Sequence, residues 1–589
     1  MKKTLLFSVA LAGLMLGSCS SSDDLNGGGN NTGSNQSGDG YVAFNINLPT
    51  QSGSSSRAGG SENDQFKDGL ASEYDVKNAT LLLFDGSDES TATFVRGYAL
   101  NTSPWTQKGP DANVTKTSAT IVQKVDAPST NYLALVVLNH NNVFSLDTDG
   151  KITVDGTDLT GLTLSKFMEK TNATTGKSLT ESGFYMANAP LANKGGGSTA
   201  PTGATINTLV SLDGKIKATE AEASATPADI YVERGVAKVT MATPTVSEVT
   251  GSYTDAAHST KVPFEVTSWA LDNTNKSTYL VRSTDGFSSW LGLATKETVA
   301  NPYRFVGSAA VATGLYRTYF AKDPNFDTAG NTGATFNKAA DTDYSTKFGD
   351  DNPKYCFENT FDVANQNDNK TTRVLIKAKL NSGKTFYVLN GNQNTIFKEE
   401  DIIKEIKSQF LTEYAQWIKD NVATPTSVGE SNVNVTISTA VGKDAGKVTI
   451  TNIELTGVTL KTGSTPLVAS DVVNNVTARL GTIDKYNNGE SYYFVRIKHF
   501  GDDLTPWANR KLGVGTQVYP APDAEANWLG RYGVLRNNWY NIAVEGVKGL
   551  GSAEVPDVTP TTDDELESYI AVRINVLSWA KRTQNATLH

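Results

Sequence analysis

Residues 569–579 read Tyr-Ile-Ala-Val-Arg-Ile-Asn-Val-Leu-Ser-Trp, and this stretch decides how the rest of the chain is interpreted. Its large apolar residues alternate with alanine, arginine and asparagine, which is typical of a β-strand with one apolar face. The apolar set is Ile570, Val572, Ile574 and Val576. Residues 551–568 before it contain two prolines and an acidic run, so we expect a solvated linker there. The sequence therefore predicts a strand carried on a tether.

The other end of the chain carries a similar pattern. In residues 41–49, Val42, Phe44, Ile46 and Leu48 alternate with small or polar residues. A Ser/Gly-rich stretch ending in Arg57 follows, and such a segment suits an arginine-specific protease. A lone arginine in a loop is more often only a surface residue. Because the two ends carry look-alike strands, our interpretation is that one strand can replace the other.

Length and composition favour a secreted all-β protein of two domains. The chain has 589 residues, too many for one core, and only 19% of them are charged. Its net charge of −10 disfavours nucleic acid and anionic membranes, which attract basic faces. The only cysteines are Cys19 and Cys356, so a disulfide framework is excluded.

The first residues predict export. Lys2 and Lys3 precede an apolar run from Leu5 to Leu16, too short to span a membrane, and we assign residues 1–18 to a signal peptide. Leu16-Gly-Ser-Cys19 is similar to the bacterial lipobox, in which the cysteine is acylated. A plain signal peptide with an incidental cysteine is the alternative. Residues 20–40 are a low-complexity tether of the kind that follows such a lipid.

Dense β patterns fill the rest of the chain. We place one domain at residues 58–283, a second at residues 284–550, and a linker with a terminal strand at residues 551–589. Residues 398–419 form the one convincing amphipathic helix, because their apolar residues recur at helical spacing. Such a helix is expected to cover a sheet and not to line a cofactor site.

Motifs that would carry chemistry are weak or missing. The four histidines are scattered, with no zinc-binding spacing. The calcium-like pattern that starts at Asp147 has its glycine at the fourth place instead of the sixth, so a hairpin turn is preferred. Cys356 has no evident histidine partner and is expected to be a buried thiol. We predict no catalytic, cofactor-binding or metal-binding residue, and therefore no enzyme.

Five blocks of the sequence together resemble the FimA/Mfa-type fimbrilins, the subunits of type V pili of Bacteroidetes, and the Mfa-type shaft subunit most closely. Each block is weak alone, but their order and spacing are specific. They are the lipobox at Cys19, residues 43–49 with Arg57-Ala-Gly, residues 232–238 (VERGVAK), residues 536–542 (RNNWYNI) with Gly549-Leu-Gly551, and residues 568–579. Residues 21–24 (SSDD) also resemble a Bacteroidetes surface-export signal.

The resemblance implies two β-sandwich domains of transthyretin-like topology and a lipid on Cys19. It also implies cleavage between Arg57 and Ala58 by an outer-membrane arginine-specific protease, which removes the propeptide of residues 19–57 together with the first strand. A neighbour's C-terminal strand, residues 570–576 with Trp579, then fills the groove. The implied partners are copies of the chain, anchor and tip fimbrial subunits, the protease, and the outer membrane before cleavage. The implied product is an extracellular fimbrium that supports adhesion and biofilm formation.

Two alternatives stay open from the sequence. A surface glycan-binding lipoprotein of a polysaccharide-uptake system would share the lipobox and the β domains, but it needs no terminal strand on a tether. Within the pilus family, an anchor subunit should lack the arginine site and a tip subunit should lack the donor strand. Both features are present here, which favours a shaft subunit.

Overall fold

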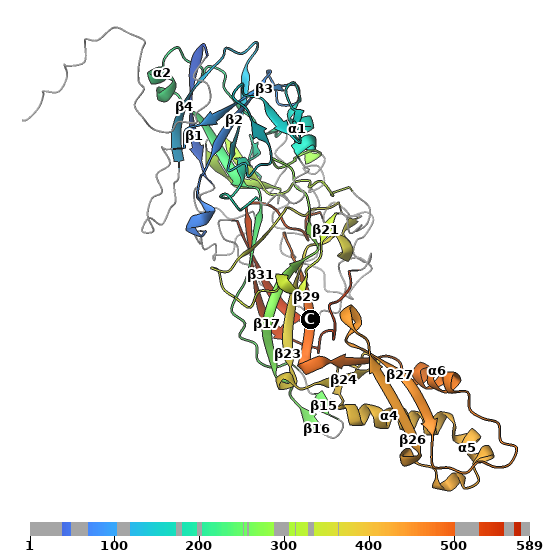
Figure 1. The fold of residues 1–589 in the computed structure, drawn as a ribbon. Helices are drawn as coiled ribbons and strands as arrows, with labels where there is room; N and C mark the ends of the chain where they lie inside the picture. Colours follow the sequence, from blue (N-terminus) through green and yellow to red (C-terminus); the bar gives the residue numbers. More distant parts are fainter. Residues whose placement is uncertain are drawn as a thin grey trace, which may run out of the picture.

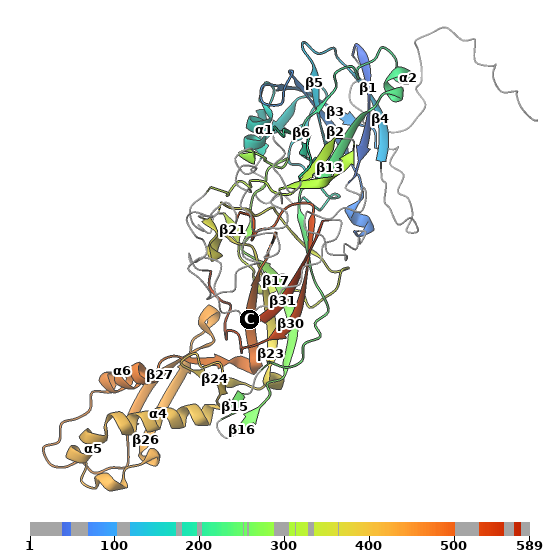
Figure 2. The same ribbon diagram turned by 180° about the vertical axis from the view of Figure 1, so that it is seen from behind.

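The structure is a computed structural model that describes residues 38–48, 69–102, 118–171, 179–196, 203–250, 253–255, 258–287, 305–312, 314–327, 335–362, 365–500, 529–558 and 570–578. Within these residues the chain is mostly β-sheet, as predicted. The molecule is elongated, with a β-rich region at one end, a sandwich in the middle and a mixed α/β lobe at the other end (Figure 1). The reverse view in Figure 2 shows the same three regions in a row.

The first region is built on one mixed sheet. Its strand order is β3-β2-β5-β9-β13-β1-β4, with β12 also paired to β5. Side chains from both halves of this sheet share one apolar core, so the region is sandwich-like. The strands are β1 (Gly40–Asn47), β2 (Ala79–Asp85), β3 (Thr93–Leu100), β4 (Ser118–Val125), β5 (Tyr132–Leu138), β9 (Met186–Asn188), β12 (Val210–Ser211) and β13 (Ala228–Arg234). Two short helices, α1 (Leu164–Thr171) and α2 (Glu220–Ala225), pack on it.

The middle region is a sandwich of two sheets. One has the order β22-β14-β30-β31 and the other β17-β23-β29, and their apolar side chains form a second core. The strands are β14 (Ala237–Met241), β17 (Phe264–Asp272), β22 (Lys354–Cys356), β23 (Arg373–Leu380), β29 (Glu490–Arg496), β30 (Asn538–Val547) and β31 (Ile570–Ser578). Trp269 and Tyr540 are fully buried in this core.

The third region has a core of its own that the sequence did not predict. This core lies on its sheet, β24-β28-β27-β26, under three helices. The elements are β24 (Phe386–Leu389), β26 (Val433–Thr439), β27 (Lys447–Leu455), β28 (Ile483–Tyr486), α4 (Glu399–Glu413), α5 (Ala415–Asn421) and α6 (Ala469–Leu480).

The sequence predicted a single helix in the second half, and this prediction differs from the structure in two ways. The segment at 398–419 is divided into α4 and α5, because Tyr414 leaves helical geometry with φ −104° and ψ 13°. Helix α6 was missed, although Val472, Val476 and Leu480 recur at helical spacing and are buried against β27 and α4. Its polar residues and its N-terminus without a side-chain cap make the helical signal weak.

Several small sheets accompany the larger ones. They comprise β6 (Ser145–Leu146), β7 (Ile152–Val154) and β8 (Thr157–Asp158); β10 (Leu191–Ala192), β11 (Ile206–Asn207), β19 (Val306–Ala312) and β20 (Leu315–Thr318); β15 (Tyr253–Asp255), β16 (His258–Thr260) and β25 (Thr395–Ile396); and β18 (Thr274–Asn275) with β21 (Phe336–Asn337). Strand pairing crosses the predicted boundary at residue 283, because β14 and β17 pair with strands of the second half. The domain limits themselves stay a prediction.

Candidate functional site: the slot of strand β1 and the terminal strand β31

Strand β1 lies inside the first sheet with a neighbour on each side. It pairs in parallel with β13 and antiparallel with β4, so that Phe44 lies opposite Ala228 and Ile121. In the strand order β4 comes last, and β1 is the strand that joins it to the sheet. Removal of β1 would therefore leave two facing sheet edges with unpaired backbone groups.

The core face of β1 is fully packed. Val42, Phe44 and Ile46 have no exposed surface, and Leu48, directly after the strand, is 2% exposed. All four belong to the core of the first region. At about 1.5–3 kcal/mol for each large apolar side chain, they contribute roughly 6–12 kcal/mol of gross hydrophobic stabilisation. That β1 is removable stays a prediction, but a vacant slot here would be deep and apolar.

The outer face of β1 carries specific polar contacts. The Asn45 side-chain amide donates to Asp229 Oδ1 on β13 at 2.9 Å, and Thr120 on β4 donates to Asn45 Oδ1 at 2.8 Å. Ala43 also alternates onto this face, yet it is fully buried, and helix α2 packs against β1. The alternating pattern did not reveal that specific polar contacts and a buried alanine lie on this outer face, because periodicity identifies only the core side of the strand.

The predicted processing residues Cys19, Arg57 and Ala58 lie outside the described residues. The chain re-enters the structure at Gly69 and is then tied to the middle sandwich by Glu73. That carboxylate is fully buried, pairs with Lys238 Nζ at 2.8 Å, and accepts a hydrogen bond from the Tyr355 hydroxyl at 2.6 Å. The contacts that hold Glu73 therefore involve no residue of β1.

Strand β31 lies at a sheet edge. It pairs antiparallel with β30, with Ile574 opposite Ile542 and Val576 opposite Tyr540, and it has no second neighbour in the strand order of the described residues. The structure therefore places the predicted donor strand on its own subunit's sandwich (Figure 1). Trp579, the last predicted donor residue, lies outside the described residues.

The predicted linker is attached along its first part. Gly551 is buried and its carbonyl accepts a hydrogen bond from the Tyr486 hydroxyl at 2.7 Å, while the Ser552 backbone pairs with Tyr492. Further on, the Pro556 carbonyl accepts a hydrogen bond from the Arg373 guanidinium. The expectation of a solvated tether from residue 551 onwards is therefore wrong for residues 551–556. The small side chains of Gly551, Ser552 and Ala553 let the backbone dock where polar partners such as Tyr486 are available.

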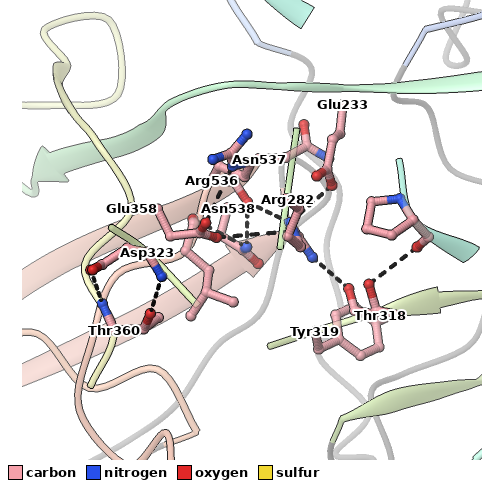
Figure 3. A network of polar contacts seen from close by, with 12 residues as sticks. Glu233, Arg282, Thr318, Tyr319, Asp323, Glu358, Thr360, Arg536, Asn537 and Asn538 are labelled. Carbon is pink, nitrogen blue, oxygen red and sulfur yellow. Dashed lines mark hydrogen bonds and ion pairs between the residues drawn. The ribbon is translucent and has the colours of Figure 1, made fainter. Parts of the chain in front are cut away.

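A buried ionic network connects β13, the neighbour of β1, to the start of β30, the partner of β31 (Figure 3). Arg282 pairs with Glu233 of β13 at 2.9 Å and donates to the Arg536 carbonyl at 3.0 Å, just before β30. Arg536 pairs with Glu358 at 3.3 Å. Burial raises the pKa of Glu233, and the arginines oppose that shift. Because breaking a buried pair leaves an uncompensated charge, this network fixes β13 relative to β30.

Two sequence blocks, 232–238 and 536–542, meet around this network. The Asn537 side chain accepts from the Arg234 backbone N–H at 3.4 Å, and the Lys238 ammonium lies 4.1 Å from the Trp539 ring centre. Nearby, burial raises the pKa of Asp323 to about 7. The two blocks carried the family resemblance in the sequence. Their contact in the structure could not be predicted, because it joins residues far apart in the chain. Glu73 and Glu358 carried no sequence signal at all.

The remaining candidates for chemistry have structural explanations. Asp147 Oδ1 accepts backbone N–H groups of Asp149 and Lys151 in a turn between β6 and β7. Burial raises the pKa of the Cys356 thiol to about 12, which disfavours the reactive thiolate. The described residues contain no cluster of three or more metal-ligating side chains. In the same part of the chain, none of the helices has the length and apolarity to cross a membrane.

A family comparison bears on the C-terminal half of this site. Residues 484–585 match the model described as major fimbrial subunit protein type IV, fimbrillin, C-terminal. These residues are thus similar to the C-terminal region of the fimbrillins. They contain β29, β30 and β31 of the middle sandwich, and thus the edge on which the terminal strand lies. The match confirms the resemblance predicted from the sequence and supports a fimbrial subunit.

The other comparisons add little. Among solved structures, a candidate cell adhesion protein from Bacteroides eggerthii is similar over 92% of this chain and 98% of its own, at 10% identity and a TM-score of 0.31. A likeness this low carries no argument about function. A search of curated proteins finds no significant match.

Proposed function

We propose that this chain is a shaft subunit of a surface fimbria and that it polymerises by exchange of terminal strands. The observation that carries the proposal is the position of β1: an interior strand with four buried apolar residues lies just before the arginine segment. The fimbrillin match over residues 484–585 supports a fimbrial subunit. A structural family of this kind implies a role without catalysis.

In this account the protein is exported as a lipoprotein. The signal peptide ends at residue 18, Cys19 carries the lipid, and residues 19–57 form a propeptide that includes β1. While β1 fills its slot, a second strand cannot enter. Cleavage between Arg57 and Ala58 releases the anchor and β1 together, which converts a membrane-attached precursor into an assembly-competent subunit outside the cell.

The vacated slot then accepts the C-terminal strand of another copy, which is strand addition to open sheet edges. Residues 559–569 connect the attached segment to β31, and an extended chain of this length reaches roughly 40 Å. Each subunit offers one slot and one strand, so the contacts run head-to-tail and do not close. Such contacts build filaments. Anchor and tip subunits at the two ends, and roles in adhesion and biofilm formation, belong to the same proposal.

The rival proposal is a surface glycan-binding lipoprotein. Such a protein keeps its lipid and its first strand for life, whereas a shaft subunit must lose both. The two functions are separated by the N-terminus of protein extracted from the cell surface. A shaft subunit should begin at Ala58, and a glycan-binding lipoprotein should begin at acylated Cys19.

The test of processing uses Arg57→Ala. This variant should leave a lipidated monomer, because the protease has lost its site and β1 stays in its slot. Intact mass and native gels of the surface-extracted protein report both properties, with Arg57→Lys as the control for protease specificity. Normal polymers in the Arg57→Ala variant would overturn the assigned site.

The test of anchoring uses Cys19→Ala. The variant should incorporate no radiolabelled palmitate, because a single thioether-linked cysteine carries the anchor, and the precursor should be misrouted. Cys356→Ala is the matched control, since that thiol is buried within the fold. Label that persists in Cys19→Ala would refute the lipoprotein assignment.

A further inference from the structure

The two terminal strands can be aligned residue by residue without a gap. Residues 41–48 read YVAFNINL and residues 569–576 read YIAVRINV, with four of the eight positions identical. In this alignment Ile570, Val572, Ile574 and Val576 take the places of the four buried residues of β1. The core face alone distinguishes the registers only weakly, because a shift by two residues still places branched apolar side chains at three of the four core positions and puts Ser568 or Ser578 at the fourth.

The outer face does distinguish the registers. The place of Ala43 is fully buried, and the aligned residue is Ala571. A shift by two residues would put Arg573 there in one direction and Tyr569 in the other. A buried site that is filled by a methyl group cannot take either side chain without displacing its surroundings or burying a charge. Of these three registers, only the unshifted one keeps alanine at this place.

The unshifted register also creates a new charge pair. Asn45 lies between Asp229 on β13 and Thr120 on β4, and its side chain contacts both of them. The aligned residue of the terminal strand is Arg573. An arginine at this place lies opposite an exposed carboxylate across two paired strands, which is a favourable cross-strand arrangement. The precursor has an amide here, so the ion pair would exist only between subunits.

We infer that Asp229 sets the register of subunit assembly by pairing with Arg573 of the incoming strand, with Ala571 seated in the place of Ala43. This inference rests on the proposed strand exchange and adds its register and its recognition residue. Asp229 thereby acts as a specificity-determining residue of the slot. It selects a strand that carries a cation at the place of Asn45.

Cysteine cross-linking in the full chain, after cleavage with an arginine-specific protease, tests the register. Arg573→Cys is combined in turn with Ser118→Cys, Thr120→Cys or Val122→Cys, the β4 partners of Asn47, Asn45 and Ala43. Directly opposed residues lie within disulfide range, whereas diagonal neighbours are at or beyond its limit. Cleavage removes Cys19, and Cys356 is buried, so the background should be low.

The inference predicts that only the pair of Arg573→Cys with Thr120→Cys gives a ladder of disulfide-linked multimers. A ladder with the Ser118→Cys or Val122→Cys variant instead would overturn the register while leaving strand exchange intact. Polymers that form with no cross-link at any of the three positions would overturn the proposed function itself, because the terminal strand would then not lie beside β4.

A charge exchange tests the recognition residue separately. Arg573→Asp should slow polymerisation at low salt by about fivefold or more, since a surface pair of this kind is worth up to about 1 kcal/mol and the variant adds repulsion. The double variant Arg573→Asp with Asp229→Arg should restore the rate, because the charges are opposite again. Equal rates in all three proteins would refute the role of Asp229.

Discussion

Strands β1 and β31 share a sequence pattern but occupy different environments. The first lies inside a sheet, with β13 and β4 on its two sides and a fully buried apolar face. The second lies at an edge, with β30 as its single partner among the described residues. A strand that leaves an edge for a vacant interior slot gains a second ladder of backbone hydrogen bonds and covers two exposed sheet edges. Under the proposed strand exchange, the direction of assembly would follow from where the two strands lie once β1 is removed.

The largest effect is expected from deletion of β31. Truncation after Glu567 should abolish polymer formation after cleavage, because no strand remains to enter the slot. The monomer should still fold and be cleaved, since β31 is an edge strand and the segment up to Pro556 keeps its contacts. Native gels and thermal melting of the uncleaved protein measure the two properties. A truncated protein that polymerises, or that unfolds outright, would show that β31 belongs to its own sandwich.

A single charge should act almost as strongly. Ile574→Asp should prevent assembly, because an unpaired carboxylate in the apolar place of Ile46 costs several kcal/mol. Ile574→Val, which keeps the apolar face, is the matched control and should assemble. Filament yield after protease treatment is the readout. Assembly of the aspartate variant at the control's level would mean that the slot does not receive this face.

The reverse experiment concerns β1. Phe44→Ala should destabilise the uncleaved precursor by about 3–5 kcal/mol, the usual cost of removing a buried phenylalanine. The mature filament should be unchanged, because β1 has left it. Denaturant unfolding of the precursor and of filaments from the same preparation gives both numbers, with Phe44→Leu as a milder control. Filaments weakened as much as the precursor would indicate that β1 stays in place.

The smallest effect should come from filling a space. Val572 is the aligned partner of Phe44, so exchange puts a smaller side chain in that place. Val572→Phe should make filaments somewhat harder to dissociate, because the place already accommodates a phenyl ring. The denaturant midpoint of filament dissociation measures this, beside Val572→Ala, which should lower it. A lower midpoint for the phenylalanine variant would indicate a different register or an overpacked slot.

The sequence predicted strands β1 and β31 themselves better than the strands and side chains that contact them. Alternation placed Val42, Phe44, Ile46 and Leu48 on one face because a buried face imposes period two on a strand. It could not tell that β13, far along the chain, is a neighbour of β1, since pairing between distant strands leaves no local pattern. The docking of residues 551–556 was missed for the same reason, because it depends on partners such as Tyr486 and Arg373.

The third region shows a different limit. Its helix at 398–419 was predicted from periodicity, but the break at Tyr414 and the separate core beneath it were not. A helix can be recognised from its own residues, whereas the division of apolar residues among several cores depends on the whole chain. The buried network of Glu233, Arg282 and Glu358 was invisible for the same reason, because charged residues are usually expected at the surface.

The central claim is that the C-terminal strand of one copy replaces β1 of another, and two complementary variants test it most directly. Arg57→Ala keeps its slot filled and can only donate a strand. The chain truncated after Glu567 can only accept one after cleavage. Neither should assemble alone, and their mixture treated with protease should give a one-to-one heterodimer by native mass spectrometry. A mixture that stays monomeric, or a variant that assembles by itself, would contradict strand exchange.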